Sequence, residues 1–166
     1  YKNCKNKTIG YDPWLHTISE INELTNYCNT ETRIKKCQNL VDLIWSKKPK
    51  QVPQRIEIHP QKFSGTNCKI KKNLVSKLIS KNQADAVILT KPESICWLLN
   101  IRGKDIAHTP IVQSLAIVKN NSEVKLFIRE NNLPKKVTSF LGDGVEIFHQ
   151  SRFSEYVLQI KNQSIQ

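Results

Sequence analysis

The side chains of this sequence that could carry chemistry are concentrated in residues 97–110. The segment begins Trp-Leu-Leu-Asn-Ile-Arg-Gly-Lys-Asp, so an apolar stretch ends in Asn100 and charged groups follow around a glycine. Loops that display charged groups on a rigid scaffold are frequent places for binding residues. The residues leave two interpretations open. Either Asn100, Arg102, Asp105 and His108 are binding residues, or Asn100 caps a helix while Arg102 pairs with Asp105.

The rest of the sequence shows no pattern typical of a catalytic or metal site. The histidines are scattered, and Asp105-x-x-His108 is the only tight acid–imidazole pair, which would need further ligands from elsewhere to hold a metal. The glycines form no phosphate-cradling loop, and no serine lies in a Gly-x-Ser-x-Gly elbow. Cys96 falls in an apolar helix, where a thiol is expected to pack rather than react. We therefore predict no catalytic residue, no metal ligand and no cofactor in this chain.

The elements that position this segment follow from apolar periodicity and capping patterns. Helices are predicted at residues 18–28, 40–45, 70–82, 93–99, 134–141 and near 156–160. Strands are predicted at residues 7–11, 33–37, 84–90, 111–118, 124–128 and 145–148, of which the fourth and fifth form an antiparallel hairpin. Capping boxes are predicted at Thr17-x-x-Glu20 and Thr90-x-x-Glu93. The third helix is predicted to bury one apolar row, made of Ile70, Leu74, Leu78 and Ile79.

Strands that alternate with helices, together with one hairpin, predict an α/β fold with a mixed sheet flanked by helices. The stretch from Ser46 to Arg55 is rich in Lys, Pro and Gln and has no apolar period, which is typical of a linker. It separates a small partial α/β domain, residues 1–55 with the linker, from a second domain, residues 56–166. The chain starts without Met, so we expect further residues upstream.

The net charge of +12 over 166 residues raises the question of nucleic-acid binding. The cations are not clustered, are not interleaved with aromatic residues, and are mostly Lys, which is the weaker residue for bidentate phosphate contacts. We interpret the charge as a result of base composition and expect no nucleic-acid partner. There is no apolar run of about 18 residues and no signal-peptide pattern, so we expect no membrane span and a cytoplasmic location with reduced cysteines.

The Trp-Leu-Leu-Asn-Ile-Arg-Gly-Lys-Asp-Ile stretch followed by Pro110 closely resembles the middle-domain signature of aminopeptidase P, in the creatinase/prolidase "pita-bread" superfamily. Residues 9–13 resemble the last strand and turn of that family's first domain, and residues 39–45 resemble the segment that closes it. Residues 63–65 correspond loosely to the start of the second domain. The resemblance implies a creatinase N-terminal-like fold with a ribonuclease H-like motif. It also implies that the chain holds the end of one such domain and the whole of a second.

The same resemblance implies a parent enzyme, a metallopeptidase that removes an N-terminal residue preceding proline. Its catalytic domain would follow residue 166 and would hold a dinuclear manganese centre ligated by two Asp, one His and two Glu. This chain would then be a non-catalytic part that walls the cleft and helps to form a homodimer, with Asn100, Arg102 and His108 at the cleft rim and Trp97 packed behind them. An alternative from another class is a non-enzymatic binding module, similar to pita-bread histone chaperones, for a charged protein partner.

Overall fold

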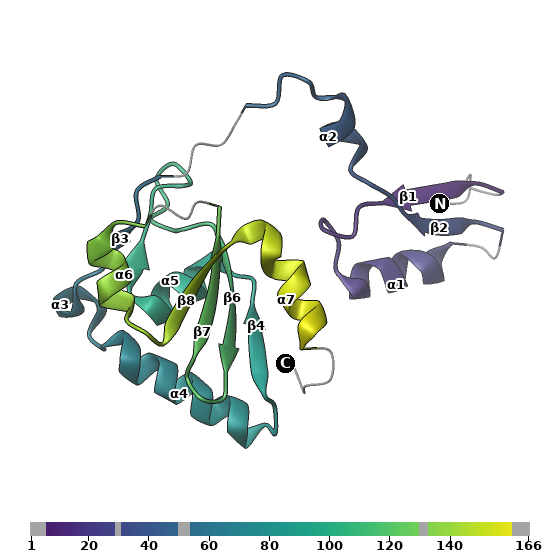
Figure 1. Cartoon of the computed structure of the whole chain (residues 1–166). Helices are drawn as coiled ribbons and strands as arrows, with labels where there is room; N and C mark the ends of the chain where they lie inside the picture. Colours follow the sequence, from purple (N-terminus) through teal and green to yellow (C-terminus); the bar gives the residue numbers. More distant parts are fainter. Residues whose placement is uncertain (1–5, 29–30, 50–53, 130–132, 161–166) are drawn as a thin grey trace. The chain divides into compact units, whose positions relative to one another are not determined.

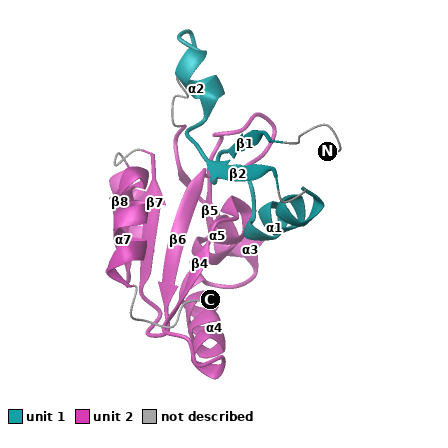
Figure 2. Cartoon of the chain, turned by 90° about the vertical axis from the view of Figure 1, so that its right-hand side faces the viewer, with its two compact units in different colours: residues 1–51 teal, residues 52–166 magenta. Residues whose placement is uncertain are grey.

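The computed structural model describes residues 6–28, 31–49, 54–129 and 133–160. The chain divides into two compact units, residues 1–51 and residues 52–166 (Figure 2). The predicted linker at Ser46–Arg55 includes residues 50–53, which lie outside the described residues. No helix in the described part of the chain is long and apolar enough to cross a membrane.

Unit 1 is a small βαβ arrangement whose elements were all predicted. Its elements are β1 (Thr8–Tyr11), α1 (Ile18–Tyr27), β2 (Arg33–Lys36) and α2 (Leu40–Ile44). Strands β1 and β2 pair in parallel, which requires a crossover such as α1 between them. The capping box at the start of α1 is confirmed, because the Thr17 side chain accepts from the Glu20 N–H at 3.2 Å and the Glu20 carboxylate accepts from the Thr17 N–H at 2.7 Å.

Unit 1 has no buried side chain among its described residues. Its large apolar residues face outward: Trp14 is 73% exposed, Ile18 is 82% exposed and Ile44 is 80% exposed. A two-stranded sheet with one covering helix needs a hydrophobic face buried against other elements to be stable. Unit 1 therefore has regular secondary structure without a core of its own.

Unit 2 is built on a four-stranded mixed sheet in the order β4-β6-β7-β8. The strands are β4 (Ala86–Leu89), β6 (Ser114–Lys119), β7 (Val124–Ile128) and β8 (Val145–His149). β4 and β7 are both antiparallel to β6, and β8 is parallel to β7. The predicted hairpin, β6 with β7, is confirmed, and these two central strands are almost wholly buried, as their apolar composition requires.

Helices cover both faces of this sheet (Figure 1). One face packs against α4 (Cys68–Lys81), α5 (Pro92–Leu99) and α6 (Lys135–Leu141) and holds the larger core cluster. The other face packs against α7 (Phe153–Gln159), and Phe127 lies at the centre of its aromatic cluster, 5.6 Å from the Phe148 ring and 5.5 Å from the Tyr156 ring between centroids. The predicted fold class, a mixed sheet flanked by helices, is confirmed.

Four short elements were not predicted. They are β3 (Glu57–Ile58), α3 (Gln61–Ser64), β5 (Ile101–Arg102) and the 3-10 turn η1 (Gln150–Arg152). β3 and β5 form a separate antiparallel ribbon that carries the middle of the Trp97–Asp105 segment. Pieces of two to four residues are too short to show apolar periodicity, which explains why the sequence did not indicate them.

Two local predictions were wrong. The buried row expected on α4 faces outward, with Ile70, Leu74 and Leu78 exposed by 53%, 53% and 58%, and of that row only Ile79 is buried. Helix α4 buries a different face, made of Cys68, Lys71, Lys72, Ser76 and Ile79. The second capping box does not form either, because the N-cap of α5 is Lys91 and has no side-chain cap bond. Pro92 at the first position, with its fixed φ, starts the helix there.

Candidate functional site

The Trp97–Asp105 segment runs from the end of α5 into β5. Helix α5 ends at Asn100, whose φ of 51° and ψ of 46° place it in the left-handed region. Asn tolerates this conformation better than most residues other than Gly, and it ends a helix in the way a C-terminal Gly does. The chain then turns so that Ile101 and Arg102 pair with Ile58 and Glu57 of β3, and the Asn100 carbonyl accepts from the His59 N–H at 2.7 Å. The helix-cap interpretation of Asn100 is confirmed.

The side chain of Asn100 is buried and joins three parts of unit 2. Its Oδ1 accepts from the ammonium group of Lys71 at 2.7 Å, and its Nδ2 donates to the carbonyl of Thr66 at 2.9 Å. Lys71, which is 2% exposed, also donates to the Trp97 carbonyl at 2.9 Å. Both acceptors of this buried ammonium are neutral, so burial and the nearby Arg102 lower the pKa of Lys71. The network fastens α4 to the last turn of α5.

Arg102 contacts the backbone of the same helix end. Its Nη1 donates to the carbonyls of Cys96 at 3.1 Å and Ile101 at 2.8 Å, where a cation is favoured by the negative end of α5. Loss of solvent, followed by the positive charges of Arg102 and Lys71, lowers the pKa of His59. Asn100 and Arg102 therefore lie in one positively charged region, together with Lys71 and His59.

Asp105 organises the loop rather than pairing with Arg102. Its Oδ1 accepts from the Gln54 N–H at 3.0 Å and its Oδ2 from the Gln113 N–H at 2.7 Å. Among the described residues, no ion pair joins Asp105 to Arg102, so that part of the structural interpretation was wrong. A carboxylate that accepts two backbone amides holds a loop in one shape.

His108 lies apart from the other predicted site residues. It is exposed, has a φ of 62°, and sits inside a bridge between Ile106 and Thr109. Within the described part of the chain, no hydrogen bond links it to Asn100, Arg102 or Asp105. The structure thus brings Asn100 and Arg102 together, gives Asp105 a separate role in the loop, and leaves His108 at the surface.

Trp97 and Cys96 differ in environment although they are adjacent. We expected Trp97 to pack behind the site, but it is 51% exposed, and its ring lies over the ammonium group of Lys71 at 4.5 Å. Cys96 is buried as expected, accepts from the Val112 N–H at 3.2 Å, and has its thiol pKa raised chiefly by burial. The arrangement can present positive charge and an aromatic surface to a neighbouring group, but these residues contain no acid–base pair.

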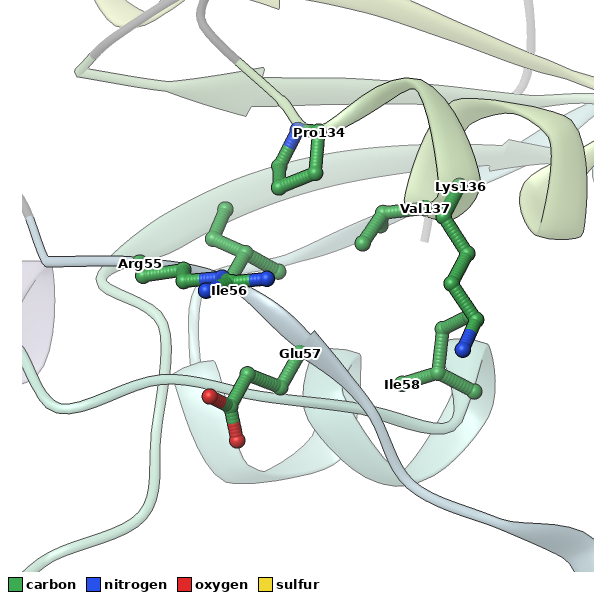
Figure 3. Close-up of a pocket in the computed structure, with 7 residues that line it drawn as sticks. All are labelled: Arg55, Ile56, Glu57, Ile58, Pro134, Lys136 and Val137. Atoms are coloured by element: carbon green, nitrogen blue, oxygen red, sulfur yellow. The ribbon is translucent and has the colours of Figure 1, made fainter.

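A hollow of about 220 Å³ lies beside β3 (Figure 3). Ile56, Ile58, Pro134 and Val137 give it apolar walls from β3 and the start of α6. Its polar members are Arg55, Glu57 and Lys136. A single carboxylate with no partner acid, histidine or nucleophile in the lining does not indicate catalysis. In the described ranges as a whole, no three His, Cys, Asp or Glu side chains lie close enough to hold a metal ion.

Comparison with known proteins places unit 2 in a family. Residues 47–166 match the model of the creatinase/prolidase N-terminal domain. The chain belongs to that family. It is 33% identical over 150 residues to a probable Xaa-Pro aminopeptidase P of Ajellomyces capsulatus and 32% identical over 146 residues to aminopeptidase P1 of Lotus japonicus.

The likeness extends to a solved structure. The X-prolyl aminopeptidase of Caenorhabditis elegans, described as a cytosolic enzyme with a di-nuclear active site, matches 95% of this chain with a TM-score of 0.86 and 23% identity, which shows a common fold. The two curated relatives are covered over only 23% and 22% of their length, although 85% and 86% of this chain is matched. This creatinase/prolidase N-terminal domain chain thus spans about a quarter of the relatives it matches.

Sequence analysis missed two members of the charged region of this creatinase-type domain. Lys71 belongs to Lys69-Ile70-Lys71-Lys72, one of the densest lysine groups, which was attributed to base composition, and His59 was counted among the scattered histidines. A signal for Lys71 was present, because a lysine on the inner face of a helix must find acceptors when it is buried. That signal could not be used while the wrong face of α4 was taken as buried.

Proposed function

We propose that this chain is a supporting region of a metal-dependent Xaa-Pro aminopeptidase. Residues 1–55 would be the end of a first creatinase-N-like domain with its linker, and residues 56–166 a complete second one. Their role would be to wall the substrate cleft and help form a homodimer, in a cytoplasmic enzyme that removes an N-terminal residue preceding proline. The support comes from relatives named Xaa-Pro aminopeptidase P and from the cytosolic C. elegans enzyme.

The observation that carries this proposal is the missing core of unit 1. A βαβ arrangement that leaves Trp14, Ile18 and Ile44 mostly exposed cannot repay the entropy of ordering its chain by burial alone. Further chain that covered these side chains would supply the missing core. A part of a larger α/β domain is the simplest source of such a cover.

Unit 2 offers a second surface of the same kind. On α4, Ile70, Leu74 and Leu78 form an outward apolar row at helical spacing, although unit 2 has a complete core elsewhere. Apolar rows on a folded domain are typical of surfaces that pack against another domain or subunit. The row is therefore a candidate contact with the remainder of the enzyme or with a second subunit.

The chemistry of the proposed parent would require a dinuclear metal centre, with manganese as the proposed metal. The described residues do not fit such a centre, because they contain no cluster of three His, Cys, Asp or Glu side chains. No catalytic step is assigned to this chain. When bound in the parent, the metals would activate water and stabilise the oxyanion of peptide hydrolysis.

An aminopeptidase assay tests whether catalysis requires parts of the enzyme outside this chain. The purified chain, with manganese and an Xaa-Pro peptide, is expected to release no N-terminal residue, whereas a longer product of the same gene should do so. Manganese-dependent release by the 166-residue chain would overturn the supporting role. Hydrogen exchange provides a separate test, because amides of β1 and β2 should exchange far faster than those of β6 and β7 in this chain.

A binding module without catalysis is the second candidate, and helix α4 favours it. The exposed surface of the helix carries lysines at positions 69, 77 and 81 and no acidic residue, beside its outward apolar row. Such a face suits an acidic protein partner. The five metal ligands distinguish the two candidate functions. The enzyme requires them in the gene product, whereas the binding module does not.

A further inference from the structure

A second hollow of unit 2 includes the start of α4, which directly follows Thr66, the residue whose carbonyl accepts from Asn100. It has a volume of about 650 Å³ and is bounded by the first half of α4, the β6–β7 turn and the loop between α6 and β8. Figure 1 shows the β6–β7 turn next to α4 at this point. The Ser122 hydroxyl donates to Oδ1 of Asn73 at 3.0 Å, which joins the turn to the helix.

Lys72 lies in the wall of this hollow and is only 8% exposed. Its ammonium lies 3.1 Å from the position that a Cβ on Gly144 would take, and Gly144 lines the hollow too. Among the described residues, Lys72 has no hydrogen-bond or ion-pair partner, whereas the neighbouring Lys71 has two acceptors. No buried side-chain nitrogen or oxygen of the described residues lacks a partner, so the unpaired ammonium of the largely buried Lys72 side chain must reach solvent. An oxyanion in the hollow could replace this solvent with a charge-assisted hydrogen bond.

The start of α4 opens on the same hollow. Asn67, Cys68 and Lys69 line it, and α4 is a helix of 14 residues, so its positive end faces the space. The Asn67 side chain accepts a hydrogen bond from the Lys69 N–H at 2.7 Å. The other N–H groups of the first helical turn have no partner within the helix and point out of its N-terminal end. Helix starts with free amides and a nearby cation are frequent oxyanion sites.

Two carboxylates also line the hollow and limit how strongly it can bind. Glu123 is already paired with Lys119 at 2.9 Å, and this hydrogen bond lowers the pKa of Glu123. Asp143 forms no ion pair with a described residue and contributes one negative charge to the wall. Among the lining residues without an ion pair, Lys69 and Lys72 carry two positive charges and Asp143 carries one negative charge, so the hollow is positively charged overall.

We propose that this hollow binds a small oxyanion, a phosphate or carboxylate group, with Lys72 as its main charged contact and the start of α4 as its second. The site does not depend on the proposed aminopeptidase role. Asp143 opposes the bound charge, which gives the site a variant that should strengthen binding as well as one that should weaken it.

The test is a titration of the 166-residue chain with inorganic phosphate, acetate and chloride at matched ionic strength, followed by ¹H–¹⁵N NMR. Saturable shifts are expected at Cys68, Lys69 and Gly144 with phosphate, acetate or both, and the anion that binds identifies the group. Lys72→Met should weaken binding at least about tenfold, since charge-assisted hydrogen bonds are worth more than a factor of ten. Lys81→Met removes the same charge at the far end of α4 and should change affinity less than about twofold.

Shifts that are linear in salt, equal for chloride, or unchanged in Lys72→Met would overturn the site. Should Lys72→Met lower the melting temperature without anion so far that it does not fold, Asp143→Asn decides the question. That variant should tighten binding by about two- to fivefold, because a screened like charge is removed. Unchanged affinity in Asp143→Asn would contradict the proposed position of the anion.

Discussion

Replacement of Asn100 by Ala tests the network that fixes the Trp97–Asp105 segment. Asn100 is 2% exposed and lies in the left-handed backbone region, and its side chain makes hydrogen bonds of 2.7 Å to Lys71 and 2.9 Å to Thr66. Ala keeps neither bond and tolerates the backbone conformation less well. The substitution therefore removes three contributions to the stability of unit 2 at one position.

Each contribution has a typical size. Loss of an acceptor for a buried charged donor costs about 1.5–3 kcal/mol, and loss of the donor to the Thr66 carbonyl costs about 1 kcal/mol. The left-handed conformation costs an L-residue other than Asn about 1 kcal/mol more. We expect Asn100→Ala to lower the free energy of unfolding by about 3–5 kcal/mol, a large part of the stability of an ordinary domain.

Urea unfolding followed by far-UV circular dichroism measures this effect. Asn82→Ala is the matched control, because the Asn82 side chain makes one exposed bond of 2.8 Å to Leu78 and should cost less than about 1 kcal/mol. Asn100→Gly separates the backbone term, since Gly adopts the left-handed region freely. A loss below about 1 kcal/mol in Asn100→Ala would refute the network as the fastening of α4 to α5.

Three further outcomes follow from the same region. Because burial lowers the pKa of Lys71 in the folded state, the unfolded chain binds more protons just below the ordinary Lys pKa of about 10.4, so the unfolding free energy should rise with pH there. This slope should be smaller in Lys71→Met, and equal urea midpoints against pH for both proteins would contradict the assignment. Gly103→Ala should destabilise by about 1–3 kcal/mol in urea unfolding, because a Cβ would lie 2.9 Å from the Ile111 carbonyl oxygen; no loss would show that the loop can move aside. Cys96, buried and with a raised thiol pKa, should react with a thiol reagent only in urea, as followed by mass spectrometry of labelled peptides, and fast labelling of the native chain would contradict its burial.

The sequence predicted the regular elements well where a local signal existed. The capping box at Thr17 and Glu20 fixed the start of α1, and Asn39 capped α2 by accepting from the Val41 and Asp42 N–H groups. The turn between residues 119 and 124 joined β6 to β7 as an antiparallel pair. These features depend on residues a few positions apart, so no tertiary information was needed.

The prediction failed on α4 because the helix carries two apolar rows. Val75 and Ile79 face the core, whereas Ile70, Leu74 and Leu78 face outward at the same spacing. Hydrophobicity alone favours burial of the row of Ile70, Leu74 and Leu78, because the inner face also holds Lys71 and Lys72. Only the tertiary contacts of those lysines decide which row is buried, and these contacts involve residues far along the chain, such as Asn100.

The structure shows hydrogen bonds of the candidate residues that the sequence did not predict. Asn100 and Arg102 both form hydrogen bonds at the end of α5. The partners of Asp105 are backbone amides of Gln54 and Gln113, which leave no side-chain signal in the sequence. A contact with a substrate or a second domain stays a prediction for Asn100, Arg102, Asp105 and His108.

The intact mass of the endogenous gene product, with its reading frame followed past Gln166, tests the central claim most directly. A supporting region of an Xaa-Pro aminopeptidase predicts a product much larger than 19.2 kDa, with two Asp, one His and two Glu metal ligands after residue 166. A product that ends near residue 166, or that continues without those ligands, would contradict the account and leave the binding module.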